Sequence, residues 1–118
     1  MVGSKEYFYY LRRAFFFNRV CGYRLNRKVN NRTCIYFEDG KWVVAYVKKG
    51  IAIDSKLYDE NNLWNACEDI TKRLAQNDNH YKKIWMDWAS PVNWAKKMDE
   101  PIGIRVVTNE DIDKSKGE

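Results

Sequence analysis

The Asp39-Gly40 dipeptide, which separates two apolar runs, is the feature that most constrains how this chain can fold. A two-residue Asp-Gly loop fits a type I′ turn, because both central residues of that turn need positive φ. The turn also fixes the strand register, and the opposed pairs are Glu38 with Lys41, Phe37 with Trp42, Ile35 with Val44 and Thr33 with Tyr46. One face therefore carries large side chains, and the other carries Cys34, Tyr36, Val43 and Ala45.

A second turn and a helix follow the hairpin. Lys49-Gly50 returns residues 51–53 beside Val47, which predicts a three-stranded antiparallel meander over residues 33–53. Asp59 is a suitable N-cap for a helix over residues 59–76, ending near Ala75. Its apolar residues recur at helical spacing, namely Leu63, Cys67, Ile70 and Leu74. A sheet covered by this helix is the predicted centre of the fold.

The N-terminal quarter predicts a helix and a strand. Ser4 is a candidate N-cap for a helix with an apolar stripe, and Gly22 is a candidate for its end. The stripe consists of Tyr7, Tyr10, Leu11, Ala14 and Phe15 or Phe17, with Phe8 and Phe16 off its centre. Tyr23 and Leu25 then alternate with Arg24 and Arg27, which predicts a strand with its arginines on one face.

The C-terminal part predicts two helices and a strand. Asp78 caps a helix that carries Tyr81, Ile84, Trp85 and Trp88, and Ser90-Pro91 starts a second, short helix. Residues 102–108 read as a last strand, and residues 109–118 as a charged tail. The prediction is therefore one α+β domain over residues 1–108, in which a small antiparallel β-sheet, including that C-terminal strand, packs against α-helices.

Length and composition agree with one folded domain. The chain has 118 residues, of which 45% are hydrophobic and 15% aromatic, and domains cluster at about 100–150 residues. No apolar run reaches the roughly 18–20 residues of a membrane span, and the first residues lack the basic-then-apolar order of a signal peptide. We therefore expect a cytoplasmic protein that makes no membrane contact. Three cysteines without zinc-type spacing fit a reducing compartment.

The charge is concentrated at the N-terminus. Residues 1–32 hold eight basic side chains and one acidic one, whereas the other 86 residues hold 13 basic and 15 acidic ones. The net charge is therefore +7 in the first part and −2 in the second. Such a basic block attracts an acidic partner, either a protein face or a nucleic acid.

Two groups of residues are candidates for contact with a partner. The first comprises basic residues, namely Arg12, Arg13, Arg24, Arg27, Lys28 and Arg32. The second comprises tryptophans that are close in sequence, Trp85, Trp88 and Trp94, a residue type enriched at interface hot spots. Core packing is the competing interpretation for most tryptophans, yet a domain of this size cannot easily enclose every aromatic side chain.

The sequence contains no motif that is typical of a catalytic site. His80 is the one histidine and lies in a polar loop, and Cys34 and Cys67 lie at positions predicted to be interior. The adjacent carboxylates Glu68-Asp69 and Asp99-Glu100 point in different directions, and the six glycines do not form a phosphate-binding loop. We expect no enzyme activity, no cofactor, no metal and no small-molecule substrate.

Two segments resemble small bacterial immunity proteins of polymorphic toxin systems, including contact-dependent growth inhibition. They are residues 31–47, with Asp39-Gly40-Lys41-Trp42, and residues 58–74, with Ala66-Cys67, and together they cover 34 of the 118 residues. Residues 78–108 have no counterpart in that pattern. The resemblance implies a non-enzymatic protein that forms a one-to-one complex with a cognate toxin domain, usually a nuclease, and covers its active site.

The charge of this chain departs from that of many toxin inhibitors, which are acidic. Either the toxin is acidic where it is contacted, or the contact uses the acidic residues within 59–69 and 99–113. The alternative function is a small basic nucleic-acid-binding domain, with N-terminal arginines on phosphates and exposed aromatic side chains on bases. An enzyme is the third alternative.

Overall fold

A computed structural model describes residues 3–99 of the chain and has an α+β fold, as predicted. The elements in chain order are α1 (Ser4–Phe17), β1 (Tyr23–Leu25), β2 (Arg32–Glu38), β3 (Lys41–Lys48), β4 (Ile51–Asp59), α2 (Leu63–Leu74) and α3 (Asp78–Asp99). The predicted strand at residues 102–108 and the predicted tail at 109–118 lie outside the described residues. None of the helices in the described part is both long and apolar enough to cross a bilayer.

The central hairpin has the predicted register. Strands β2 and β3 are antiparallel, with Phe37 opposite Trp42 and Ile35 opposite Val44. Asp39 and Gly40 have φ values of 53° and 77°, as a type I′ turn requires. The pattern of two apolar faces is also confirmed, since Ile35, Trp42 and Val44 join the main core while the opposite-face residues form a second buried cluster. That second cluster contains Cys34, Tyr36, Val43, Ala45 and Val47.

Strand β4 is longer than predicted and takes up the start of the predicted helix. It runs nine residues along β3, with one irregularity where Asp54 and Ser55 lie opposite Ala45. Asp54 has a positive φ of 52°, and such a bulge lets pairing continue to Asp59. Helix α2 therefore begins at Leu63 with Asn62 at its N-cap, and the prediction of Asp59 as the cap was wrong.

The sheet is mixed, because β1 pairs in parallel with β2, whereas a purely antiparallel sheet was predicted. Parallel neighbours usually need a crossover of a dozen or more residues. Here β1 has three residues, and the connection of residues 26–31 suffices to return the chain. Val29 of this connection packs on the second cluster, and its backbone N–H lies 3.4 Å from the Cys34 sulfur.

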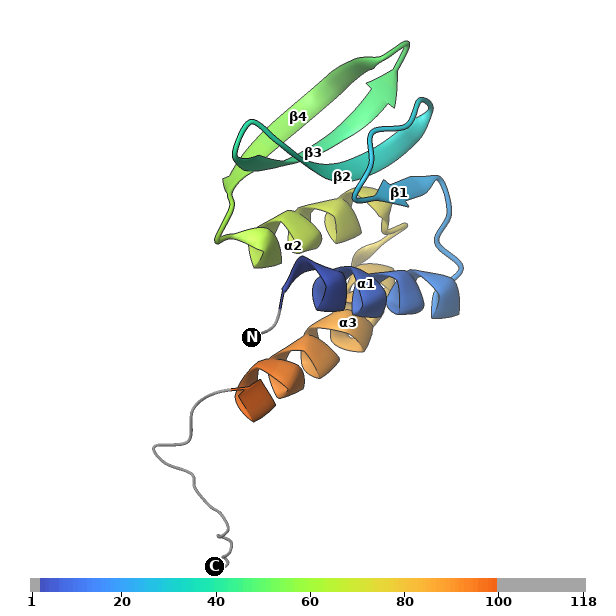
Figure 1. The fold of residues 1–118 in the computed structure, drawn as a ribbon. Helices are drawn as coiled ribbons and strands as arrows, with labels where there is room; N and C mark the ends of the chain where they lie inside the picture. Colours follow the sequence, from blue (N-terminus) through green and yellow to red (C-terminus); the bar gives the residue numbers. More distant parts are fainter. Residues whose placement is uncertain (1–2, 100–118) are drawn as a thin grey trace, which may run out of the picture.

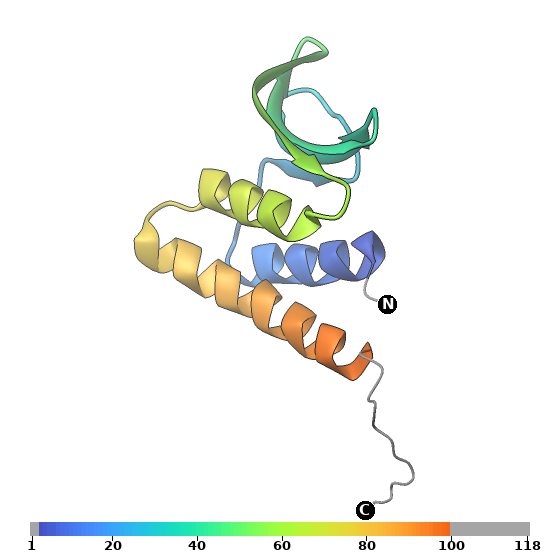
Figure 2. The same cartoon turned by 90° about the vertical axis from the view of Figure 1, so that its left-hand side faces the viewer.

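The three helices gather on one side of the strongly curled sheet (Figures 1 and 2). Helix α2 lies against the sheet, and α1 lies between α2 and α3. The main core joins all of these layers: Phe8 of α1 packs edge-on against Trp42 of β3 at a centroid distance of 5.5 Å. The other face of the sheet has the small second cluster and no helix among the described residues.

Helix α1 begins one residue earlier than predicted and ends several residues before the predicted end at Gly22. Gly3, not Ser4, is the N-cap. The backbone N–H of Gly3 donates a hydrogen bond of 3.0 Å to the Glu6 carboxylate. The helix ends at Phe17, ahead of Gly22, because the Asn18 side-chain amide donates 2.7 Å to the Ala14 carbonyl oxygen. Its buried face comprises Tyr7, Phe8, Leu11, Ala14 and Phe15.

Helix α3 continues through Pro91, so the prediction of two helices divided at Ser90-Pro91 was wrong. Interior proline loses a hydrogen bond and clashes with the preceding turn, at a cost of about 3 kcal/mol. Fully buried Ile84, Trp88 and Val92 recur every four residues on both sides of the proline. The burial of this continuous stripe outweighs the local cost and keeps the helix in one piece.

Candidate binding surface

The solvent-facing side of α1 presents a stripe of aromatic and basic side chains. Tyr9, Arg12, Arg13 and Phe16 recur at the spacing i, i+3, i+4 and i+7, which places them on one face of the helix. Tyr9 is 58% exposed and Phe16 is 75% exposed, and both arginines are exposed. Since single exposed apolar residues are common, what distinguishes this stripe is that two aromatic residues flank two arginines along one face of the helix.

The chain after α1 turns this stripe into a groove of about 650 Å³. Residues 19–23 run beside the helix and add a third arginine and a partly apolar wall. We call this feature the α1 groove; it is lined by Tyr9, Arg12, Arg13, Phe16, Arg19, Val20, Cys21 and Tyr23. Its volume falls in the range of pockets that accept compact ligands or inserted side chains.

The α1 groove is positively charged and contains no acidic side chain. The ion pairs of residues 3–99 join Lys41 to Asp59, Arg73 to Asp69 and Lys83 to Asp87, so the groove arginines take part in none of them. Burial raises the pKa of Tyr23, whereas the nearby charge of Arg12 acts in the opposite direction. The groove therefore offers three guanidinium groups to an anionic partner.

The six basic residues singled out in the sequence divide between two surfaces. Arg12 and Arg13 line the α1 groove, whereas Arg24 and Arg32 lie on the sheet face that carries Cys34. Lys28 lies on that same face, with its Nζ 5.8 Å from the centroid of the Tyr36 ring. Arg27 is exposed in the connection between β1 and β2. The two surfaces meet at the β1 edge, where Arg12 and Arg24 line one small hollow.

The tryptophans singled out in the sequence are mostly structural. Trp88 is fully buried, so its predicted place on a partner-binding surface was wrong. Trp85 is partly buried and donates a hydrogen bond of 3.1 Å to Glu68, and both rings pack on Trp64 of α2. Trp94 is 65% exposed and remains available to a partner. The indoles of residues 64, 85 and 88 thus join α2 to α3.

The sequence predictions did not include Tyr9, Phe16 and Arg19 among the residues of this surface. The helical spacing of Tyr9, Arg12, Arg13 and Phe16 was a signal that could have identified the stripe, because those residues fall opposite the apolar one. Arg19 gave no comparable signal. It enters the groove because the chain turns back after Asn18, where Arg19 takes a positive φ of 57°.

Three of the four acidic residues within 59–69 have partners in the protein itself. Asp59 lies 3.0 Å from the ammonium of Lys41, and Asp69 lies 2.9 Å from the Arg73 guanidinium. Glu68 accepts the hydrogen bond from Trp85. Of the two alternatives for a charged contact, this distribution favours the basic one over the acidic residues of 59–69; residues 100–113 lie outside the described part of the chain.

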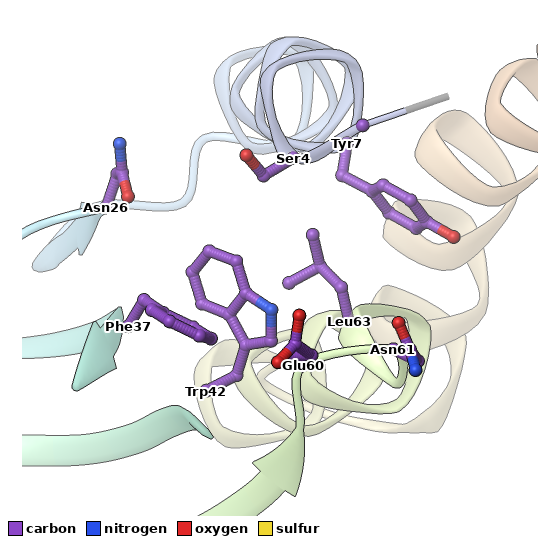
Figure 3. A pocket seen from close by; sticks show the side chains of 9 residues that line it. Ser4, Tyr7, Asn26, Phe37, Trp42, Glu60, Asn61 and Leu63 are labelled. Atoms are coloured by element: carbon purple, nitrogen blue, oxygen red, sulfur yellow. The ribbon is translucent and has the colours of Figure 1, made fainter. Parts of the chain in front are cut away.

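A second hollow, of about 520 Å³, opens at the N-terminal end of α1 (Figure 3). Its side chains come from α1, from the residue after β1, from the hairpin strands beside their turn, and from the loop before α2 and the first residue of α2: Ser4, Tyr7, Asn26, Phe37, Trp42, Glu60, Asn61 and Leu63. Glu60 is its one carboxylate, and no histidine, cysteine, lysine or arginine lines it. The lining thus lacks the paired groups of an acid–base site, and we place the candidate interface at the α1 groove.

His80 and two cysteines have structural roles. The His80 Nδ1 accepts a hydrogen bond of 3.0 Å from the Gln76 backbone, and its Nε2 lies 3.0 Å from the Asn18 carbonyl oxygen, which fixes Nε2 as the donor. Cys34 and Cys67 are buried, and burial raises the pKa of the Cys67 thiol. Within residues 3–99, no three histidine, cysteine or acidic side chains gather in a way that could hold a metal ion.

Comparisons of this chain with protein-family models, with curated proteins and with solved structures found no match.

Proposed function

We propose that this protein is an immunity protein that binds a cognate bacterial toxin domain, a nuclease in the expected case, and neutralises it by covering its active site. The observation that carries the proposal is the solvent-facing stripe of α1, in which Tyr9 and Phe16 flank Arg12 and Arg13. Aromatic and arginine side chains are the residue types that most often dominate protein interfaces.

The segments that resemble immunity proteins supply a scaffold for this surface. Asp39-Gly40 forms the hairpin turn, and Trp42, Ala66 and Cys67 are buried in the main core. The resemblance therefore rests on residues that set the fold, whereas the stripe lies on a different element. Such a division suits a protein class in which one scaffold serves different partners, because partner specificity is then set by exposed side chains.

The charge of the stripe defines the expected toxin surface. Three arginines in the α1 groove speed the encounter with an acidic face and make association sensitive to salt. A toxin whose substrate-binding face is basic would need to be contacted beside that face, with its active site blocked by the bulk of the protein. The proposal therefore predicts acidic residues at the edge of the toxin's substrate path.

Co-purification with the product of a neighbouring gene tests this proposal. If the protein is an immunity protein, its gene should lie directly downstream of a gene for a large secreted toxin. The C-terminal domain of that toxin should then form a one-to-one complex with this protein. A complex that buries about 1,200–2,000 Å² should survive gel filtration and abolish the toxin's activity. A neighbouring product that neither binds nor is inhibited would contradict the proposal.

Nucleic-acid binding is the second candidate function, and one observation favours it. Arg12 and Arg24 line the same hollow at the β1 edge, so the cations of α1 continue onto the far face of the sheet, where Lys28 and Arg32 lie. A continuous row of cations can follow a phosphate backbone. Binding of generic RNA or DNA that falls steeply with salt, in a protein that binds no toxin, would favour this function.

A further inference from the structure

We propose that the α1 groove receives an acidic amphipathic helix of the partner. This helix carries one apolar side chain at each end of the contact and carboxylates between these two side chains. The identity of the partner as a toxin rests on the proposed function, whereas the chemistry of the bound segment rests on the groove. The proposed function does not specify which segment of the toxin contacts the groove; the charge and spacing of the groove residues specify its chemistry.

The spacing of the stripe sets the spacing required of the bound segment. Tyr9 and Phe16 are seven residues apart on α1, which corresponds to about 10.5 Å along the helix axis. A partner helix spans the same distance between residues i and i+7, and its residues i+3 and i+4 then lie between the two apolar side chains. Carboxylates at these two positions face Arg12 and Arg13.

The walls of the groove match such a segment in charge and polarity. Arg12, Arg13 and Arg19 provide planar guanidinium groups that bind carboxylates in pairs of hydrogen bonds. Val20 and Tyr23 line the same groove and provide an apolar surface for an inserted aliphatic or aromatic side chain. Because Tyr9 and Phe16 project from a folded helix, their backbone positions are fixed before the partner arrives.

A helix fits this groove better than a polynucleotide does. The rings of Tyr9 and Phe16 each pack edge-on against a neighbouring ring, with centroid distances of 5.1 and 5.7 Å, respectively. Along this face Lys5 precedes Tyr9, Arg12 and Arg13 lie between Tyr9 and Phe16 in sequence, and Arg19 follows Phe16, so cationic and aromatic residues alternate instead of forming an unbroken row of cations. A short acidic segment with apolar ends satisfies both features, whereas a nucleic acid repeats the same charge at every nucleotide.

Cys21 provides a direct reporter of groove occupancy. It lines the groove and is exposed, whereas Cys34 and Cys67 are buried, so a neutral maleimide should label Cys21 first in the folded protein. The probe is a synthetic alanine-based helix of about 18 residues with Leu at i and i+7 and Glu at i+3 and i+4. One control peptide replaces both leucines with serine, and another replaces both glutamates with glutamine.

The patterned peptide should slow Cys21 labelling at concentrations up to about 1 mM, and both control peptides should bind at least about tenfold more weakly. Arg12→Glu/Arg13→Glu and Phe16→Ser should each weaken binding at least about tenfold. Lys48→Glu/Lys56→Glu changes the net charge equally at two other exposed positions and should leave binding unchanged. These results together support the inference.

Three outcomes would overturn it: no protection by the patterned peptide, equal protection by the serine control, or stronger protection by an oligo-dT strand of about 16 nucleotides. Its failure is distinguishable from failure of the immunity function. A toxin that remains bound and inhibited by the Arg12→Glu/Arg13→Glu and Phe16→Ser variants contradicts the groove inference alone. A protein that binds the patterned peptide but no neighbouring toxin contradicts the function alone.

Discussion

Tyr58 and Asp69 join the last strand to the helix that covers it, because the Tyr58 phenol donates a hydrogen bond of 2.9 Å to the Asp69 carboxylate. Asp69 also accepts from the Arg73 guanidinium at 2.9 Å, and Arg73 in turn donates 2.7 Å to the Asp54 carbonyl oxygen. The bulge, the end of β4 and the middle of α2 are thus linked through three polar side chains.

The stability of the protein should depend on Tyr58 in alkaline solution. Burial, followed by the hydrogen bond to Asp69, raises the pKa of Tyr58 from 10.0 to about 12. A raised pKa in the folded state favours the protonated phenol, so its contribution is complete below pH 10 and is lost as the pH rises through about 12. Tyr58→Phe should cost about 1 kcal/mol at pH 7.

Urea unfolding of both proteins at several pH values measures this contribution. Other tyrosines also titrate in this range, so the informative quantity is the difference in free energy of unfolding between the wild type and Tyr58→Phe. That difference should shrink as the pH rises from 10 to about 12. A difference that stays constant over this range would contradict the assigned role of the phenol.

The hairpin turn should tolerate asparagine at position 39 but not a side chain at position 40. Gly40 has φ of 77°, which is strained for residues with a Cβ, although no heavy atom lies within 4 Å of a Cβ placed there. Gly40→Ala should therefore destabilise the protein by about 1 kcal/mol through backbone strain alone. Asp39→Asn is the control, since asparagine also adopts positive φ, and thermal unfolding should find it nearly unchanged. Equal effects would argue against the turn geometry.

Substitution of two tryptophans should separate core from surface. Trp88→Ala removes a fully buried indole and should cost about 3–5 kcal/mol, whereas Trp94→Ala changes an exposed side chain and should stay within about 0.5 kcal/mol. Chemical denaturation measures both. Should Trp94→Ala prove as destabilising as Trp88→Ala, the described packing of α3 would be wrong.

Removal of the interior proline should stabilise α3. Pro91→Ala restores a backbone N–H that can donate to the Asp87 carbonyl oxygen, so the free energy of unfolding should rise by about 1–2 kcal/mol. The control is Ser90→Ala, which changes an exposed neighbour and should have a smaller effect. A lower melting temperature for Pro91→Ala would indicate that the ring contributes packing that exceeds its backbone cost.

The hairpin could be predicted because its turn depends on two adjacent residues. The pairing of β1 and the length of β4 could not be predicted, because they depend on contacts between residues that are distant in sequence. Asp39-Gly40 fixes its own turn type, and the register follows from it by counting. The parallel pairing of β1 depends on a short connection that crosses the sheet and packs Val29 on the second cluster. The extent of β4 depends on a bulge at Asp54, where no glycine indicates the positive φ.

The candidate surface was predictable in part for the same reason. Charge counting located the basic block, and Arg12 and Arg13 do line the α1 groove. A count of charged residues could not show that these basic residues lie on two surfaces, because the sheet face on which Arg24 and Arg32 lie depends on strand pairing. Trp88 could not be assigned to the core from its residue type, since its burial depends on the packing of α3 against Trp64 of α2.

Growth of bacteria that produce the neighbouring toxin domain tests the central claim most directly. Cells would also express the wild-type protein, Arg12→Glu/Arg13→Glu, or the charge-matched Lys48→Glu/Lys56→Glu variant, with equal protein levels verified. We predict that the wild type and Lys48→Glu/Lys56→Glu restore growth, whereas Arg12→Glu/Arg13→Glu does not, because the α1 groove has lost its attraction for the toxin. Failure of the wild type to restore growth, or equal rescue by all three proteins, would contradict the account.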